Sequence, residues 1–364
     1  MKKIAVKNAL ALVGFNFAKV SWLKKTLKTP NGGYTIQLKL LPGGAASELV
    51  KLKEKLASAL NVDEVDIRKI GARKLELTAR QELPRLLPEF DNGTWSSIYS
   101  GSQISSISIG KTSDGFEAIF PVSDDAGGVV SLIAGNPGSG KSSLLKIILS
   151  SLMQTNAVIV WFDPKGGADA RIFKSRVDVV GDCINAPSAT EKLVQLNELV
   201  MRRANALASG KSLDGLPPVV VFVDEWANLG VNGNKKEKEE VDAQLRKLAA
   251  MGRASKVSLI LSTQRPTATT IDVATRGMAS VRVVFGVGDV HASIAALGYP
   301  GAELLHASLD RGKALYNNGA SIQKIAIYQV PAELEELANS TFQANISLSS
   351  LATLENSVFN RAVT

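Results

Sequence analysis

The amino-acid sequence predicts an α/β protein, with a small α/β module followed by a larger domain that has a parallel-rich central sheet. The first observation behind this prediction is a set of apolar runs that have the length of buried strands and alternate with helical stretches. They cover residues 129–134, 157–162, 219–223, 257–261 and 281–287. The second observation is a shorter strand–helix–strand–strand pattern nearer the N-terminus. Regular alternation of strands and helices favours parallel pairing in the larger domain.

The composition is that of an ordinary globular protein. The chain has 364 residues, of which 45% are hydrophobic and 21% are charged, and this excludes wholesale disorder. Cys183 is the single cysteine, so no internal disulfide can form, and with two histidines it cannot complete a structural zinc site. We therefore expect a cytoplasmic protein, with the inner face of the membrane as the alternative location.

Residues 1–30 are predicted to form a basic N-terminal arm. They hold seven lysines and no acidic residue, whereas the net charge of the whole chain is +8. Such an arm favours contact with an anionic surface, either lipid or nucleic acid, or with a membrane channel. Its uncharged stretch, residues 8–18, is too short to span a bilayer. A solvated terminal helix, or a strand packed on the body, is an equal alternative.

The small module is expected over residues 31–90. Residues 34–40 alternate as a half-buried strand, residues 45–60 have helical apolar spacing, and residues 63–67 and 73–78 read as two further strands. Residues 91–125 are predicted as a linker that contains one edge strand at 104–109.

The larger domain is expected over residues 126–330. Helical periodicity covers 189–209 and 235–253, and residues 313–316 and 324–328 predict a closing hairpin. Residues 331–364 are predicted to form a helical or flexible tail that begins as a Glu-rich helix at 332–338.

Residues 135–142, which follow the apolar run 129–134, fit the phosphate-binding pattern of Gly, four residues, Gly, Lys and then Ser or Thr. Its glycines allow backbone N–H groups to close around a phosphate, and the next helix points its positive end there. Lys141 is expected to reach the β- and γ-phosphates and Ser142 to bind Mg²⁺, so ATP and Mg²⁺ are the predicted cofactors. The residues predicted to hold them are Gly135, Asn136, Pro137, Gly138, Ser139, Gly140, Lys141, Ser142, Ser143 and Asp224.

Polar residues end the other strands of the predicted sheet. Asp224 follows the strand 219–223 and can hold Mg²⁺, and the adjacent Glu225 can polarise a water for attack on the γ-phosphate. Gln264 ends the next strand and can contact the γ-phosphate or the attacking water. The turn Asp163-Pro164-Lys165 ends the run 157–162 and is therefore expected at the same edge of the sheet, where ligands gather in open α/β proteins. A plain Pro-Gly turn is an equal interpretation of these residues.

Together these segments resemble the motor of FtsK/SpoIIIE-type DNA translocases, within the FtsK–HerA group of P-loop ATPases. The resemblance covers about residues 34–330 and depends on the order and spacing of several motifs. They are GNPGSGKS (135–142), DPKGG (163–167), VVVFVDEWANL (219–229), GRASKVSLILSTQRP (252–266), VRVVFGV (281–287) and RGKALY (311–316).

The resemblance implies a RecA-like motor that assembles as a ring, expected to be hexameric, around double-stranded DNA, with ATP at the subunit interfaces. Loops that grip DNA in that family match Lys211, Lys235 and Lys236 here, and lysines suit backbone contacts that read no bases. For Lys235 and Lys236, a solvated charge run is an equal alternative. Arg253 matches a position for an arginine finger supplied to the neighbouring subunit, with Arg282 and Arg246 as the other candidates.

The function expected from these features is an ATP-driven DNA translocase with Lys141, Ser142, Asp224, Glu225 and Gln264 as its ATPase centre. The expected role is transfer of a plasmid or conjugative element, or chromosome transfer. No winged-helix module is recognisable after the motor, which argues against loading at oriented DNA sites and suits a plasmid or conjugative-element translocase, or a cytoplasmic fragment of a longer protein. One alternative is a coupling or secretion ATPase that moves single-stranded DNA or protein through a membrane channel. The other is a scaffold switched by ATP with little turnover.

Overall fold

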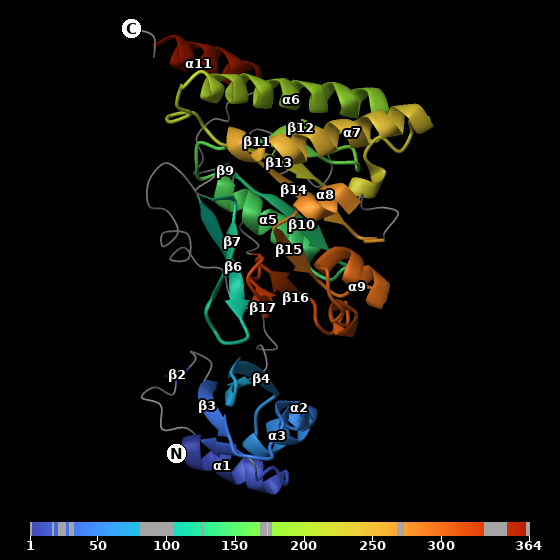
Figure 1. Cartoon of the computed structure of the whole chain (residues 1–364). Helices are drawn as coiled ribbons and strands as arrows, with labels where there is room; N and C mark the ends of the chain where they lie inside the picture. Colours follow the sequence, from blue (N-terminus) through green and yellow to red (C-terminus); the bar gives the residue numbers. More distant parts are fainter. Residues whose placement is uncertain are drawn as a thin grey trace. The chain divides into compact units, whose positions relative to one another are not determined.

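The computed structural model describes residues 2–16, 18–20, 27–28, 33–80, 105–124, 127–167, 173, 177–267, 273–330 and 348–361. The chain divides into two compact units (Figure 1). The smaller unit comprises residues 1–86 with 111–117, and the larger comprises residues 87–110 with 118–364.

The smaller unit is an antiparallel sheet covered by helices. Its strand order is β1-β3-β5-β4, and β2 also pairs with β3. Buried and exposed positions alternate along the central strand, as the sequence predicts for a half-buried strand. The strands are β1 (Ala18–Val20), β2 (Leu27–Lys28), β3 (Tyr34–Leu40), β4 (Glu64–Gly71) and β5 (Lys74–Arg80), and the helices are α1 (Lys2–Leu12), α2 (Ala46–Lys51) and α3 (Lys53–Leu60).

Helix α1 belongs to this unit and is not a separate arm. Val6, Ala9 and Leu10 are buried in the same core as Leu38 of β3 and Leu56 of α3. Their spacing of three and four residues gives α1 one apolar face, and burial of that face outweighs the charge of the neighbouring lysines. In the described part of segment 1–30, the terminal helix α1 is therefore packed rather than solvated, and β1 and β2 are strands paired with β3.

The larger unit is built on a ten-stranded sheet with the order β12-β11-β13-β14-β10-β15-β16-β17-β6-β7. The strands from β12 to β15 are parallel, and β16 and β17 continue the sheet as the expected antiparallel hairpin. The strands are β6 (Ser106–Thr112), β7 (Glu117–Pro121), β10 (Val130–Ala134), β11 (Val158–Phe162), β12 (Asp178–Val180), β13 (Val219–Val223), β14 (Val257–Thr263), β15 (Val281–Val284), β16 (Lys313–Asn317) and β17 (Ile322–Ile327).

The segment predicted as a linker contributes more structure than expected. Two strands, β6 and β7, form one edge of the large sheet, and β8 (Ser123–Asp124) pairs with β9 (Gly127–Gly128) as a separate two-stranded ribbon. Ile107, Ile109 and Phe120 from these edge strands are fully buried in the core of the larger unit. Apolar burial of this kind holds the strands on the sheet although the surrounding sequence is rich in turn residues.

Helices cover both faces of the large sheet (Figure 1). Alternate residues of β13 point to opposite faces: Val220 and Phe222 pack with α5, whereas Val219, Val221 and Val223 pack with α6 and α7. A strand buried on both faces must be apolar throughout, which explains the unbroken valine-rich run. The helices are α5 (Lys141–Leu152), α6 (Ala186–Ala208), α7 (Lys235–Met251), α8 (Val273–Met278), α9 (Val290–Leu297) and α11 (Leu348–Arg361).

The C-terminal helix α11 lies beside α6 (Figure 1), and its Leu351 and Glu355 are completely buried. Leu351 joins the core on the α6–α7 face of the sheet. The described part of the tail is therefore a packed helix. The helix predicted at 332–338 lies outside the described residues. Among the helices that the structure describes, none is long and apolar enough to cross a membrane.

Candidate functional site

The phosphate-binding pattern forms the turn between β10 and α5. Gly138 and Gly140 have positive φ angles of 79° and 122°, a region that side chains rarely adopt. A Cβ atom on Gly140 would also lie 3.1 Å from the backbone of Gly312, which precedes β16. The Gly312 N–H donates to the Ser139 carbonyl at 2.7 Å, so the turn is fastened to the neighbouring segment of the sheet. Position 140 therefore favours glycine both for its positive φ and for this close packing, whereas position 138 favours it for its positive φ alone.

The side chains of this turn fit an anionic ligand. The Ser139 hydroxyl is buried and has no hydrogen-bond partner among the described residues. A buried polar atom without a partner costs free energy, and a phosphate oxygen would supply the missing partner. Space is open where a Cβ of Gly138 would stand, and Ser142 is exposed on the first turn of α5. The turn therefore has the donors and the room for a nucleotide phosphate.

Lys141, Asp224 and Ser262 form a buried polar cluster beside this turn. The Lys141 ammonium donates to Asp224 Oδ1 at 2.8 Å and to the Ser262 hydroxyl at 3.2 Å. The Ser262 hydroxyl in turn donates to Asp224 Oδ1. The side chains of Lys141 and Asp224 are only 4% and 2% exposed, so their ion pair is almost free of solvent screening. Three segments far apart in the sequence thus converge on one carboxylate oxygen.

Opposing effects set the pKa of Asp224. Burial by itself would raise that pKa, but the charge of Lys141 and the hydrogen bonds from Lys141 and Ser262 outweigh burial. The charge of Lys165, whose ammonium lies 4.0 Å from Asp224 Oδ2, acts in the same direction. The net result is a pKa below the ordinary value for aspartate. Asp224 is therefore an ionised carboxylate at neutral pH, as a group that approaches a metal ion must be.

Glu225 is held against the end of the neighbouring strand β14. Its backbone adopts a left-handed conformation with φ 44° and ψ 66°, which is unusual for a residue other than glycine. The Thr263 hydroxyl donates to Glu225 Oε1 at 3.0 Å, and the Gln264 backbone N–H donates to Oε2 at 3.0 Å. The strained backbone is typical of functional positions and aims the carboxylate at β14.

The structure brings together most of the residues predicted for the ATPase centre. Lys141, Asp224, Glu225 and Gln264 lie at the carboxyl ends of β10, β13 and β14, which are neighbours in the sheet. The turn after β11 ends at the same edge, and there the Lys165 N–H donates to Asp163 Oδ1 at 2.9 Å. Ser262 and Thr263 had no assigned role in the sequence prediction. Their position at the end of the strand next to Asp224 was the signal that could have identified them.

The residues predicted to contact DNA do not form one surface. Lys211 lies between α6 and β13, at the amino end of that strand, whereas Lys235 and Lys236 begin α7 after its carboxyl end. Parallel strands place these two kinds of connection at opposite edges of the sheet. Lys211 also donates to the Phe359 carbonyl of α11 at 2.9 Å, so its ammonium already has a partner. Of the three lysines, Lys235 and Lys236 are the ones whose side chains are exposed at the start of a helix.

Arg253 is exposed and lies in the short 3₁₀ turn Arg253–Ser255 before β14. This turn is at the amino end of β14, whereas the phosphate-binding turn is at the carboxyl edge of the sheet. Arg253 is therefore remote from the phosphate-binding turn of its own chain. The competing candidate Arg282 is half-buried and donates to the carbonyls of Ala279 and Arg276, which is a structural role.

Known proteins similar to this chain point to one group of ATPases. A family model described as "ATPase family associated with various cellular activities (AAA)" matches residues 131–287. The chain is 30% identical over 220 residues to the DNA translocase FtsK of Staphylococcus aureus. It is 27% identical over 308 residues to the DNA translocase FtsK of Lactococcus lactis subsp. cremoris. The chain carries an FtsK/SpoIIIE-type P-loop ATPase domain.

The two alignments have different extents. The first covers 53% of this chain and 27% of the relative, and the second covers 77% and 39%. The chain therefore spans well under half of the length of either FtsK. Because the second alignment is longer than the ATPase domain matched by the family model, the likeness extends beyond that domain.

Solved structures show the same fold for the ATPase domain. The conjugation coupling protein TcpA of pCW3, in a monomer form with ATPgS, has a TM-score of 0.63 and 18% identity, with 97% of this chain and 99% of that chain covered. The cytoplasmic domain of the Type VII secretion ATPase EccC of Thermomonospora curvata has a TM-score of 0.55 and 19% identity. This match covers 73% of this chain and 34% of that chain. At these identities the likeness establishes the RecA-like fold.

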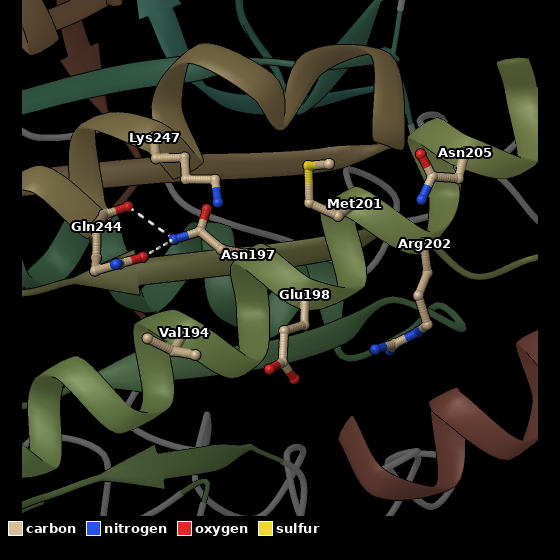
Figure 2. A pocket seen from close by; sticks show the side chains of 8 residues that line it. All are labelled: Val194, Asn197, Glu198, Met201, Arg202, Asn205, Gln244 and Lys247. Carbon is tan, nitrogen blue, oxygen red and sulfur yellow. Dashed lines mark hydrogen bonds between the residues drawn. The ribbon is translucent and has the colours of Figure 1, made fainter.

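A second concavity of the ATPase domain lies between α6 and α7, on the face that also carries α11 (Figure 2). It has a volume of about 420 Å³. Asn197 at its base donates to the backbone carbonyl and the side chain of Gln244, and Arg202 extends from α6 towards α11. This cavity contains no part of the phosphate-binding turn. The described residues also hold no cluster of His, Cys, Asp and Glu that could bind a metal ion by protein ligands alone.

Proposed function

We propose that this protein is a motor that uses ATP hydrolysis to move double-stranded DNA through a ring of identical subunits. The observation that carries the proposal is the convergence of Lys141, Asp224, Glu225 and Gln264 at one edge of the sheet. DNA is proposed as the substrate because the likeness to the DNA translocase FtsK of Lactococcus lactis covers 77% of this chain, which is enough to include the residues of this site wherever the alignment begins.

Each residue of the site has a chemical role in this proposal. Lys141 would hold the β- and γ-phosphates, and Ser142 and Asp224 would hold Mg²⁺ beside them. Mg²⁺ usually takes one or two protein ligands and completes its shell with phosphate oxygens and water, and Ser142 and Asp224 would be those two ligands. Bound Mg²⁺ supplies charge stabilisation at the phosphates.

Glu225 is the proposed general base that takes the proton of the attacking water. Its carboxylate oxygens accept hydrogen bonds from Thr263 and from the Gln264 backbone, so the position of the base depends on the end of β14. Gln264 is adjacent to this contact and would sense the γ-phosphate through its side chain. This coupling gives β14 a means to transmit the state of the nucleotide to the rest of the sheet.

The proposed ring follows from the position of Arg253. The negative charge that develops on the γ-phosphate requires compensation beyond Lys141 and Mg²⁺. Arg253 is exposed at the opposite edge of the sheet, where it can approach only the nucleotide of another subunit. Lys235 and Lys236 are exposed at the start of α7 and are proposed to grip the DNA backbone without reading bases.

DNA-stimulated ATP hydrolysis tests the proposal. We expect duplex DNA to raise the ATPase rate at low salt and the stimulation to fall as salt increases, because phosphate contacts release counterions. An ATPase rate that duplex DNA leaves unchanged at low salt would exclude the translocase.

A coupling ATPase is the second candidate, and the likeness to TcpA over nearly the full length of both chains is the observation that favours it. Stimulation by single-stranded DNA alone, with no response to duplex DNA, would select this candidate.

An ATP-switched scaffold is the third candidate function. A wild-type protein that binds ATP but releases no phosphate, with or without DNA, would select the scaffold.

A further inference from the structure

We infer that the C-terminal helix α11 positions the turn that carries Arg253, through a buried ion pair between Glu355 and Arg203. The inference rests on the proposed role of Arg253 in a neighbouring active site. Arg203 is on α6 and Glu355 is on α11, 152 residues apart in the sequence. Neither residue contacts the nucleotide site, so both are positioning residues.

The guanidinium of Arg203 joins three segments of the larger unit. Its Nε donates to Glu355 Oε1 at 2.7 Å, its Nη1 donates to the Ser255 carbonyl at 3.0 Å, and its Nη2 donates to the Pro217 carbonyl at 2.9 Å. Ser255 ends the 3₁₀ turn that begins with Arg253. Only arginine offers a planar set of donors that can reach three acceptors in different directions. Arg203 thus connects α11 directly to the turn of Arg253.

The ion pair makes Arg203 dependent on α11. The side chains of Arg203 and Glu355 are both 0% exposed. Burial lowers the pKa of Arg203, and the hydrogen bond and charge of Glu355 act against that effect. Without Glu355 the guanidinium would remain buried with no compensating charge, which is strongly unfavourable. Arg203 would then move towards water and release the Ser255 carbonyl.

The turn of Arg253 is fixed on two sides. The Ser255 hydroxyl is buried and donates to the Val200 carbonyl of α6 at 3.1 Å. On the other side, a Cβ atom on Gly127 would lie 1.9 Å from the Arg253 carbonyl, so the backbone of β9 packs directly on this turn. The backbone of Arg253 is therefore immobilised, while its side chain is exposed. A residue that must act across a subunit interface needs such a rigid base.

Two further contacts keep α11 in place. Arg202 donates to Glu355 Oε2 at 3.3 Å, and Figure 2 shows its guanidinium directed towards α11. Lys211 donates to the Phe359 carbonyl and lies 5.9 Å from the centre of the Phe359 ring. Each carboxylate oxygen of Glu355 therefore accepts from one arginine. These contacts give α11 one defined register on α6.

A double-mutant cycle on the full chain tests the inference. DNA-stimulated kcat and the KM for ATP are measured for wild type, Glu355→Gln, Arg253→Ala and the double variant. We expect Glu355→Gln to lower kcat by about ten- to a hundredfold with little change in KM, because a small displacement of a catalytic group costs that much. In the Arg253→Ala background the same substitution should have almost no effect, because the group it positions is absent.

Two more variants separate positioning from general damage. Arg203→Lys keeps the charge opposite Glu355 but has one nitrogen, which cannot also hold the Ser255 and Pro217 carbonyls, so kcat should fall again. It replaces Glu355→Gln in the cycle if the latter does not fold. Glu198→Gln removes a carboxylate from an exposed position on α6 and should leave kcat unchanged.

The outcomes distinguish the inference from the proposal beneath it. If Arg253→Ala leaves DNA-stimulated kcat unchanged, Arg253 is not the finger and that part of the proposed function fails. If Arg253→Ala lowers DNA-stimulated kcat but Glu355→Gln has no effect, or an equal effect in both backgrounds, α11 does not act through Arg253. The second result overturns the inference and leaves the proposed function intact.

Discussion

Asp224 is the residue at which charge and burial meet in the ATPase site. Its Oδ1 accepts from both Lys141 and Ser262, and Lys165 approaches its other oxygen. A phosphate oxygen can offer Lys141 the same charge-assisted bond that Asp224 offers. Under the proposed function, Lys141 would exchange one anion for the other when ATP binds, and Asp224 would then be available to hold Mg²⁺.

The first prediction concerns Lys141. Replacing it by alanine removes the cation expected to hold the β- and γ-phosphates, so ATP binding should be abolished. Titration with a fluorescent ATP analogue measures this effect. Lys146→Ala, a change on the same helix α5, is the matched control and should bind ATP normally. Retained affinity in Lys141→Ala would refute the assignment of the site.

The second prediction concerns Glu225. In Glu225→Gln the side chain keeps its size but loses the ability to accept a proton, so kcat should fall by about 10²–10⁴-fold while ATP stays bound. Rapid-quench measurement of phosphate release, together with the amount of nucleotide retained on the protein, tests this. Glu191→Gln, on the exposed side of α6, is the control. Phosphate release by Glu225→Gln at the wild-type rate would exclude Glu225 as the base.

The third prediction is a pH dependence that arises from the lowered pKa of Asp224. An aspartate whose pKa is lower in the folded state stabilises the fold above its unfolded pKa of about 3.9. That contribution is lost as pH falls through the folded-state pKa. Wild type should therefore exceed Asp224→Asn in free energy of unfolding at pH 7 by more than at pH 3, as measured by urea unfolding. A difference that does not depend on pH would contradict the ion pair.

At the scale of single elements, the start of α7 combines stability with exposed charge. Asn234 caps the helix by accepting from the Glu237 N–H, and Glu237 accepts from the Asn234 N–H in return. This capping box fixes the first turn. Lys235 is 92% exposed, and its distance of 3.9 Å from Glu239 gives an ion pair of little strength. The lysines of this turn are thus held in place and available to a partner.

The fourth prediction tests this turn as a DNA contact. Changing Lys235 and Lys236 together to alanine should weaken DNA binding and reduce the steepness of its salt dependence by about 2, since each lost phosphate contact contributes about 0.9. Fluorescence anisotropy of labelled duplex DNA over a salt series measures the slope. The arginine pair Lys235→Arg and Lys236→Arg keeps the charge and should keep the slope. If the alanine pair shows the wild-type slope, these lysines do not touch DNA.

At the scale of the whole molecule, the site of one chain is incomplete. The cluster of Lys141, Asp224 and Glu225 lies at the carboxyl ends of the parallel strands, whereas Arg253 lies at the amino end of β14. In the proposed ring, each subunit would present Arg253 to the nucleotide of the next. Association is therefore expected to control the chemistry as well as the path of the DNA.

The fifth prediction follows from this division of labour. Lys141→Ala subunits have a defective site but an intact Arg253, whereas Arg253→Ala subunits have the reverse. Each variant alone should have a strongly reduced ATPase rate with DNA, and a mixture of the two should recover part of the wild-type rate. Electron micrographs with an ATP analogue and duplex DNA should show six-fold rings. No recovery in the mixture would argue against a finger that acts between subunits.

The sequence by itself determined the fold class and the core of the ATPase site. The turn from Gly135 to Ser142 is contiguous, and Asp224, Glu225 and Gln264 directly follow apolar strands. Because the carboxyl ends of parallel strands share one edge of a sheet, chain order was enough to bring these residues together. Ser262 and Thr263 were within reach of the same reasoning, since they end the strand that carries Gln264.

Only the tertiary structure decided the contacts that join distant segments. The packing of α1 into the small core, the bond of Lys211 to α11 and the pairing of Arg203 with Glu355 each join residues with no shared local pattern. The burial of Glu355 on α11 depends on the arginines of α6 that receive it, because a charged residue gives no apolar signal in the sequence. The sequence placed Arg253 before a strand, but its separation from the phosphate-binding turn required the strand order of the folded sheet.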